Sequence, residues 1–413
     1  MFTPDPQTES VPKNENKFKA WYKKFSSQPH QPFFTSGILF LILFLSLFVA
    51  SYSNIISLDS SLLTYHAYTM IFVIFIQFFL GFLFVVFPRF LMQAEIKPEV
   101  YMKLFHMYFI ASLGIFLAIV FFSKLTIVFQ LLMLVAQALS FKLLYSIHKK
   151  SIVKVKEDTK WVLISFAAGL FGQVLFLISN FDIPYSYELS KFSINTGFYL
   201  FLFMIIFSIS QRMIPFFTTS KAPGYVINKS KNLLLVMFGL LILKVVLLTF
   251  DNAKLNLVAD IPLFILIVRE LIKWKLPIFK VPAIMWVLFL ALYWIPFAFG
   301  LSIIESLMAF VAPEILFEKV VVHTMALGYF ITVLLGFGTR VVLGHSGSTP
   351  TADDFAVFIF ISVQVITLFR IFTSFSLNFE SGYTFLLNIT AILLIIGLII
   401  WSNRYIRILL KGK

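Results

Sequence analysis

The chain has 413 residues, of which 60% are hydrophobic and 13% charged, and it carries a formal net charge of +14. So few charged residues cannot coat a soluble globule, and the apolar residues come in runs of about twenty, long enough to cross a hydrocarbon core. The composition therefore excludes a soluble fold and predicts an all-α, polytopic membrane helix bundle.

Apolar runs bounded by charged residues, Pro or polar clusters divide the chain into twelve predicted transmembrane helices. They cover residues 33–52, 66–88, 101–122, 125–147, 160–180, 191–212, 232–250, 254–272, 281–303, 318–340, 354–375 and 383–404. The weakest division is the one between the seventh and eighth spans. The predicted domains are a polar, basic N-terminal segment (1–31), the bundle (32–405) and a basic tail (406–413).

Lysine and arginine are unevenly distributed among the connecting segments. They gather in the N-terminal segment, in the tail and in alternate loops near residues 89–103, 149–160, 221–231 and 269–280. Because Lys and Arg of short loops stay on the cytoplasmic side, this pattern predicts that both termini lie in the cytoplasm. It also accounts for the positive charge without a nucleic-acid partner, since no basic stripe interleaved with aromatic residues occurs.

Several kinds of chemistry are excluded by missing residues. The chain has no cysteine, which rules out disulfides, thiolate metal sites, iron–sulfur clusters and covalent haem attachment through this chain. Walker, dinucleotide-binding and HExxH motifs do not occur, so whether the protein is an enzyme stays open. Its membrane histidines are also too few, and none are adjacent, for the catalytic subunit of a haem–copper oxidase.

The histidines provide the first candidate site. His66 and His323 lie near the starts of the second and tenth spans, which both begin on the outer side, so their imidazoles should lie at similar depth. Imidazole is a haem axial ligand and a common copper ligand, which makes this pair a candidate cofactor site. In the alternative, each imidazole only hydrogen-bonds a neighbouring helix. His30 and His148 lie in polar flanks and are predicted to be ordinary interfacial residues.

A second set of candidates lies on the predicted cytoplasmic side. His106 and His345 form a possible pair there, although a structural role is favoured for His106. His345 lies in a Gly- and Ser-rich turn of the kind that exposes a side chain to a ligand. Arg212 and Arg340 end the sixth and tenth spans, where they could anchor phosphate or propionate groups or simply mark the topology.

Three charged residues fall inside predicted spans, where each is a candidate functional residue by default. Lys244 is close enough to a span end for its ammonium to reach the interface by snorkelling. Asp260 and Arg370 could form an ion pair with each other, or bind propionates.

Two spans carry regular spacings. His66, Met70, Gln77 and Gly81 recur at steps of four and seven on the second span, which predicts a single inward-facing side. On the tenth span, small residues recur every four positions over 324–336. Such a stripe lets another helix, or a flat macrocycle, approach closely, and tight helix packing is the favoured interpretation.

The run from His323 to Gly347, HTMALGYFITVLLGFGTRVVLGHSG, resembles the late motif of the NnrS family, in which a His begins a helix, an Arg ends it and a Leu-Gly-His turn follows. The segment RMIPFFT at 212–218 is similar to the family's segment after its sixth helix, and 31–34 and 294–296 match further. The resemblance covers about residues 30–405.

The resemblance implies a haem- and copper-associated protein of the bacterial inner membrane, linked to nitric oxide metabolism, denitrification and nitrosative stress. By position, His66, His323, Arg340 and His345 carry over as cofactor-binding candidates. The expected partners are the lipid bilayer and nitric oxide, which is small, uncharged and enriched in bilayers.

One departure from the family pattern concerns the early motif, usually Trp-His-Ala-His-Glu-Met. Here Tyr68 and Thr69 stand where relatives have a His and a Glu. This implies one cofactor fewer, a weaker oxygen donor at Tyr68, or the loss of that site.

Two other functions stay open from the sequence. Twelve helices with a few intramembrane polar groups also describe a secondary transporter, although Gln77 and Gln173 are sparse for that task. A non-catalytic assembly subunit of a respiratory complex would purify with partners and without its own chromophore.

Overall fold

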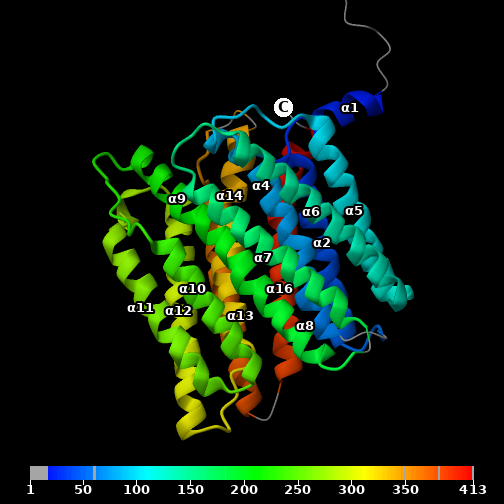
Figure 1. The fold of residues 1–413 in the computed structure, drawn as a ribbon, viewed down its shortest axis with the longest axis vertical. Coiled ribbons are helices and arrows are strands. Elements are labelled where there is room, and N and C mark those ends of the chain that lie inside the picture. Colours follow the sequence, from blue (N-terminus) through cyan, green and yellow to red (C-terminus); the bar gives the residue numbers. More distant parts are fainter. Residues whose placement is uncertain are drawn as a thin grey trace, which may run out of the picture.

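The structure is a computed structural model that describes residues 17–58, 62–181, 183–345, 347, 349–379 and 382–411. Within these ranges the chain is almost entirely helical and contains no strand. Long helices run side by side along one axis (Figure 1). The predicted all-α, polytopic helix bundle is confirmed.

The elements follow one another with short connections. In chain order they are α1 (Lys17–Phe25), α2 (His30–Tyr52), α3 (Leu62–Tyr68), η1 (Thr69–Ile74), α4 (Phe75–Phe90), α5 (Pro98–Phe121), η2 (Ser123–Leu125), α6 (Thr126–Lys150), α7 (Glu157–Ser179), α8 (Ser186–Asn195), η3 (Thr196–Phe203), α9 (Met204–Lys221), α10 (Leu233–Leu247), η4 (Leu248–Phe250), η5 (Ala253–Asn256), α11 (Leu257–Trp274), η6 (Ile278–Lys280), α12 (Ala283–Val311), α13 (Val320–His323), η7 (Thr324–Ile331), α14 (Thr332–His345), α15 (Asp354–Phe375), η8 (Ser376–Phe379) and α16 (Tyr383–Lys411).

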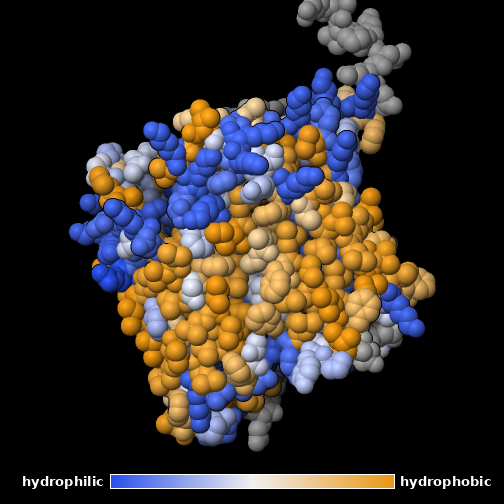
Figure 2. All heavy atoms as spheres, in the orientation of Figure 1, coloured by the Kyte–Doolittle hydropathy of each residue, from blue (hydrophilic) through white to orange (hydrophobic). Residues whose placement is uncertain are grey.

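The surface reflects the lipid environment that the composition predicts. Figure 2 shows hydrophobic side chains covering the middle of the visible face and hydrophilic side chains at the ends, most densely near α1. Helices suit this setting because each satisfies its own backbone hydrogen bonds, which lipid cannot do. The apolar belt is suited to contact with lipid.

In the described part of the chain, eleven helical stretches are long and apolar enough to cross a membrane. The predicted span 254–272 corresponds to α11, which carries Asp260, Arg269, Glu270 and Lys273 and is too highly charged to qualify. α11 nevertheless packs against α10 and α12 as part of the bundle. A twelfth crossing therefore stays a prediction.

The described ends of the chain, α1 and the C-terminal end of α16, lie at the same end of the bundle (Figure 1). We call this the basic end, and the opposite end, where α3 and α13 begin, the histidine end. Which side of the membrane each end faces stays a prediction based on the distribution of Lys and Arg.

The centre of the described bundle is formed by three spans. The most apolar stretch of these three spans is more buried than that of the other candidate spans, of which 28–61% is buried. The buried share is 83% in Leu63–Phe90, 83% in Ser186–Lys221 and 78% in Val320–Gly344. The described helices that form the bundle thus fall into three consecutive groups of four, and each group contributes its second helix to the centre.

Each central span contains a π-helical turn, η1, η3 and η7, and each of these turns begins with a threonine. Such turns are rare and occur frequently at functional sites. Their aromatic rings interlock: Phe72 stacks on Phe201 at 6.2 Å between centroids, and Phe198 lies 5.2 Å from Phe330. The π-helical turn η1 interrupts the spacing predicted from His66 to Gly81, yet both residues lie against α2, at Phe48 and Phe34.

The small-residue stripe of the tenth span packs against α12. A Cβ atom on Gly328 would lie 2.5 Å from the ring of Trp294, and one on Gly336 would lie 2.6 Å from Leu288. Both contacts require the absence of a side chain. The prediction of tight helix packing along this stripe is confirmed.

Candidate cofactor site

His66 and His323 lie together at the histidine end, on α3 and α13, just before the π-helical turns η1 and η7. They are close enough to interact electrostatically with each other, and both interact with Arg370. The ring of His66 also packs against Phe48 of α2 at 4.6 Å between centroids. Two of the three central helices thus bring one imidazole each to a shared place.

Arg370 of α15 is the cation beside these imidazoles. It is 4% exposed, and its Nη1 donates a hydrogen bond to Ser374 Oγ at 2.5 Å. It also hydrogen-bonds Tyr383. No carboxylate among the described residues forms a salt bridge with it. The predicted pair with Asp260 is therefore wrong.

The hydrogen bonds around His323 permit two tautomers. Its Nδ1 lies 3.0 Å from the backbone oxygen of Lys319 and 3.1 Å from Nη2 of Arg370. A guanidinium only donates, so it bonds an Nδ1 without a proton, whereas the carbonyl only accepts and requires a proton on Nδ1. When the proton is on Nδ1 and bonded to the carbonyl of Lys319, Nε2 keeps its lone pair. This tautomer is the one that can bind a metal.

The donor set at this place consists of two imidazoles. In the described part of the chain, no group of three or more His, Asp or Glu side chains is arranged to hold a metal ion. Zinc and copper held by protein alone take three or four protein ligands. A haem iron needs at most two, because the macrocycle supplies the rest. The residues present therefore fit a haem better than an isolated copper or zinc ion.

A family model described as NnrS protein matches residues 24–413. The chain belongs to the NnrS family. No curated protein gives a significant match. Because the NnrS match covers both central helices that carry the histidines, the resemblance read from the motifs at 212–218 and 323–347 is confirmed.

The departure from the usual NnrS motif has two parts: Tyr68, which faces away from His66, and Thr69, which donates a hydrogen bond to the backbone oxygen of His66 at 3.2 Å. Tyr68 is fully buried, its hydroxyl accepts a hydrogen bond from Gln173 Nε2 at 3.3 Å, and its ring lies 4.4 Å from Phe176. Both partners belong to α7, whereas His66 contacts α2. Thr69 donates to the backbone oxygen of Tyr65 at 2.8 Å. Tyr68 thus points to α7, whereas Thr69 contacts the backbone beside the imidazole of His66.

The other histidines of this NnrS chain have structural surroundings. The ring of His106 stacks on Tyr22 of α1 at 6.4 Å, and His148 Nδ1 lies 3.0 Å from Thr159 Oγ1. His345 ends α14, but its side chain lies outside the described residues, so its predicted pairing with His106 has no structural account.

A buried ion pair joins α10, α11 and α12 and was missed by the sequence reading. Lys244 and Asp260 are 1% and 0% exposed, and Lys244 Nζ donates to Asp260 Oδ1 at 2.6 Å. Ser302 Oγ donates to the other oxygen of Asp260, also at 2.6 Å. The prediction that Lys244 snorkels is wrong, because its ammonium is held inside the bundle by this carboxylate.

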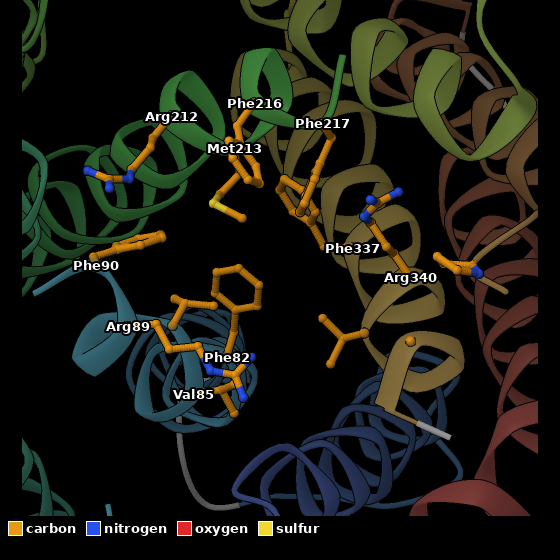
Figure 3. Close-up of a pocket in the computed structure, with 14 residues that line it drawn as sticks. Phe82, Val85, Arg89, Phe90, Arg212, Met213, Phe216, Phe217, Phe337 and Arg340 are labelled. Carbon is orange, nitrogen blue, oxygen red and sulfur yellow. The ribbon is translucent and has the colours of Figure 1, made fainter. Parts of the chain in front are cut away.

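Arg212 and Arg340 lie at the basic end, away from the histidines. Arg340 follows His323 by seventeen positions on the same central span, which corresponds to about 25 Å of helix. The two arginines line a common chamber of about 770 Å³ (Figure 3). The candidate residues from the sequence thus separate into two places, an imidazole pair at one end and an arginine chamber at the other.

Proposed function

We propose that this NnrS-family protein binds a haem between His66 and His323 and acts through it on nitric oxide, in nitric oxide metabolism or the response to nitrosative stress. The observation that carries the proposal is the meeting of two imidazoles, from separate central helices, beside a buried arginine that forms no salt bridge with a described carboxylate. Family membership supports the cofactor class, and the two-imidazole donor set favours haem over copper.

The residues around the pair have separable tasks. His66 and His323 would hold the haem through their imidazoles, and the backbone oxygen of Lys319 would accept the Nδ1 proton of His323 and hold its ring in orientation. Arg370 would then be released from Nδ1, free to donate to a propionate. When bound, the haem would supply an iron that binds nitric oxide. Phe48, against His66, keeps the surroundings apolar, which suits an uncharged diatomic ligand.

For the location, we propose the bacterial inner membrane with both termini in the cytoplasm. The dense hydrophilic surface at the basic end and the position of both described chain ends there support this orientation. The histidine end would then face the periplasm, and nitric oxide would reach the site through the bilayer.

The test is an absorption spectrum with metal analysis on detergent-purified protein, oxidised and dithionite-reduced, before and after adding nitric oxide. We expect a Soret band that shifts with nitric oxide, and a loss of at least about tenfold in haem per protein for His66→Ala or His323→Ala. His106→Ala and His148→Ala are the matched controls and should keep the wild-type haem content. Unchanged haem in both site variants would refute the assignment.

A colourless, metal-free protein after haem-sufficient expression would instead favour a secondary transporter. The observation on that side is the buried pair of Lys244 and Asp260, since intramembrane ion pairs also mark ion and solute pathways. Solute-dependent uptake into vesicles that Asp260→Asn abolishes would then be the expected result. Co-purification with respiratory subunits would point to an assembly role.

A further inference from the structure

The chamber at the basic end lies between α4, α9 and α14, and phenylalanine side chains from these helices point into it (Figure 3). Its volume of about 770 Å³ is in the range that holds one drug-sized ligand. Its described lining contains no acidic residue; the lining residues are Phe82, Val85, Val86, Arg89, Phe90, Arg212, Met213, Phe216, Phe217, Phe337, Arg340, Val341, Gly344 and Pro350.

The described arginines of the lining, one from each central span, differ in their partners. Arg212 Nη1 is 2.6 Å from Asp158 Oδ2. Arg89 pairs with Glu95 at 2.9 Å on an exposed surface. Arg340 has no salt bridge to a described carboxylate, and its Nη1 is buried without a hydrogen-bond partner.

Aromatic rings hold these guanidinium groups in place. The Cζ of Arg340 lies 3.7 Å from the ring centroid of Phe217, and that of Arg212 lies 4.0 Å from Phe90. Stacking of this kind orients a guanidinium and leaves its in-plane N–H groups available to an acceptor. The chamber therefore presents a fixed, unneutralised donor at an apolar wall.

A buried guanidinium nitrogen without an acceptor is unfavourable, and a carboxylate or phosphate is the group with which a guanidinium pairs best. An inorganic anion would use only the charge, whereas the surrounding phenylalanines offer apolar contact as well. We propose that the chamber binds one amphipathic organic anion, with its carboxylate or phosphate on the guanidinium of Arg340 and its apolar body among Phe82, Phe216 and Phe337. This site is separate from the imidazole pair and does not rest on the proposed function.

The test uses the full chain in phosphatidylcholine nanodiscs, with binding measured by native mass spectrometry. Oleate represents an anion from the membrane and 2-naphthoate one from the aqueous phase, and oleyl alcohol and 2-naphthalenemethanol are their uncharged counterparts. We expect one equivalent of oleate or 2-naphthoate to bind, and its alcohol to bind at least about tenfold more weakly, because the charge-assisted bond is lost. Which acid binds identifies the source of the anion.

Arg340→Gln should weaken binding of that acid by at least about tenfold. The matched control is Arg404→Gln, which removes an exposed arginine that pairs with Asp353 outside the chamber. Phe337→Trp, which reduces the space and keeps the charge, should also weaken binding and serves if Arg340→Gln does not fold. The Soret band should be unchanged in all three variants.

Three results would overturn the proposal. One is the lack of saturable 1:1 binding of either acid. Another is equal affinity of Arg340→Gln and Arg404→Gln. The third is binding of an alcohol as tightly as its acid, which would show that the chamber recognises only apolar bulk. Each leaves the haem assignment at His66 and His323 unaffected, because that assignment is read from a separate spectrum.

Discussion

Two buried cations in this bundle have opposite surroundings. Lys244 is neutralised by Asp260, which also accepts a hydrogen bond from Ser302, so all the charges in that cluster are paired. Arg370 is almost as deeply buried, yet it contacts Ser374 and an imidazole in place of a carboxylate among the described residues.

The difference separates structural charges from candidate ligand sites. A closed ion pair is complete and holds helices together, whereas a buried cation that lacks its anion leaves an interaction for a ligand to make. Arg340 resembles Arg370 in this respect, since one of its nitrogens is buried without a partner. Both incomplete cations lie on or beside the central helices.

The largest expected effect comes from breaking the closed pair. Asp260→Asn leaves the Lys244 ammonium buried without its counter-charge, so the free energy of unfolding should fall by about 3–5 kcal/mol. Unfolding in mixed detergent, followed by circular dichroism, measures it. Asp251→Asn, at the exposed pair with Lys191, is the control and should cost less than about 1 kcal/mol. Equal losses in the two variants would contradict the assignment of Lys244 and Asp260 as a structural pair.

Arg370→Gln should act on the cofactor more than on the fold. Because no described carboxylate forms a salt bridge with Arg370, stability should change less than in Asp260→Asn, while haem affinity should fall by about 10- to 100-fold. Haem titration of the apoprotein measures this affinity. Arg370→Lys keeps the charge but loses the planar guanidinium, so its haem affinity should lie between those of wild type and Arg370→Gln. A large stability loss with unchanged haem affinity would place Arg370 with Lys244 as a structural cation.

Restoring the family's usual residues should have a smaller effect. In the double variant Tyr68→His, Thr69→Glu, a new imidazole and carboxylate would replace side chains of which Tyr68 packs on α7, away from Phe48. We expect added copper per protein in metal analysis, with the haem content within about twofold of wild type, because Tyr68 packs on α7 and Thr69 donates to backbone oxygens and not to the imidazole of His66. Loss of haem in this variant would show that the two positions share one site.

The smallest effect is expected when both members of the closed pair are replaced. Lys244→Met with Asp260→Leu removes both charges, and such replacements are often neutral or stabilising. The free energy of unfolding should therefore stay within about 1 kcal/mol of wild type. A loss as large as that of Asp260→Asn alone would mean that Ser302 or Tyr199, whose ring lies 5.4 Å from Lys244 Nζ, depends on the pair.

Much of the candidate site could be anticipated from sequence. The depth of His66 and His323 follows from where their spans begin, and the NnrS motifs follow from local strings of residues. Their contact with Arg370 could not be anticipated, because it depends on the rotation of α13 and α15 about their own axes. The π-helical turns change that rotation and leave no clear signal in hydrophobic spacing.

What the sequence by itself determined was the helical class, the order of the apolar spans and the family, because run length, composition and motif strings are local properties of the chain. Only the tertiary structure decided which charges are paired. Asp260 forms its ion pair with Lys244, and Arg370 instead contacts His323. Which charged groups pair in a bundle depends on which helices lie next to each other. It likewise placed the arginines of three distant spans around one chamber, because those spans are the ones that the other helices enclose.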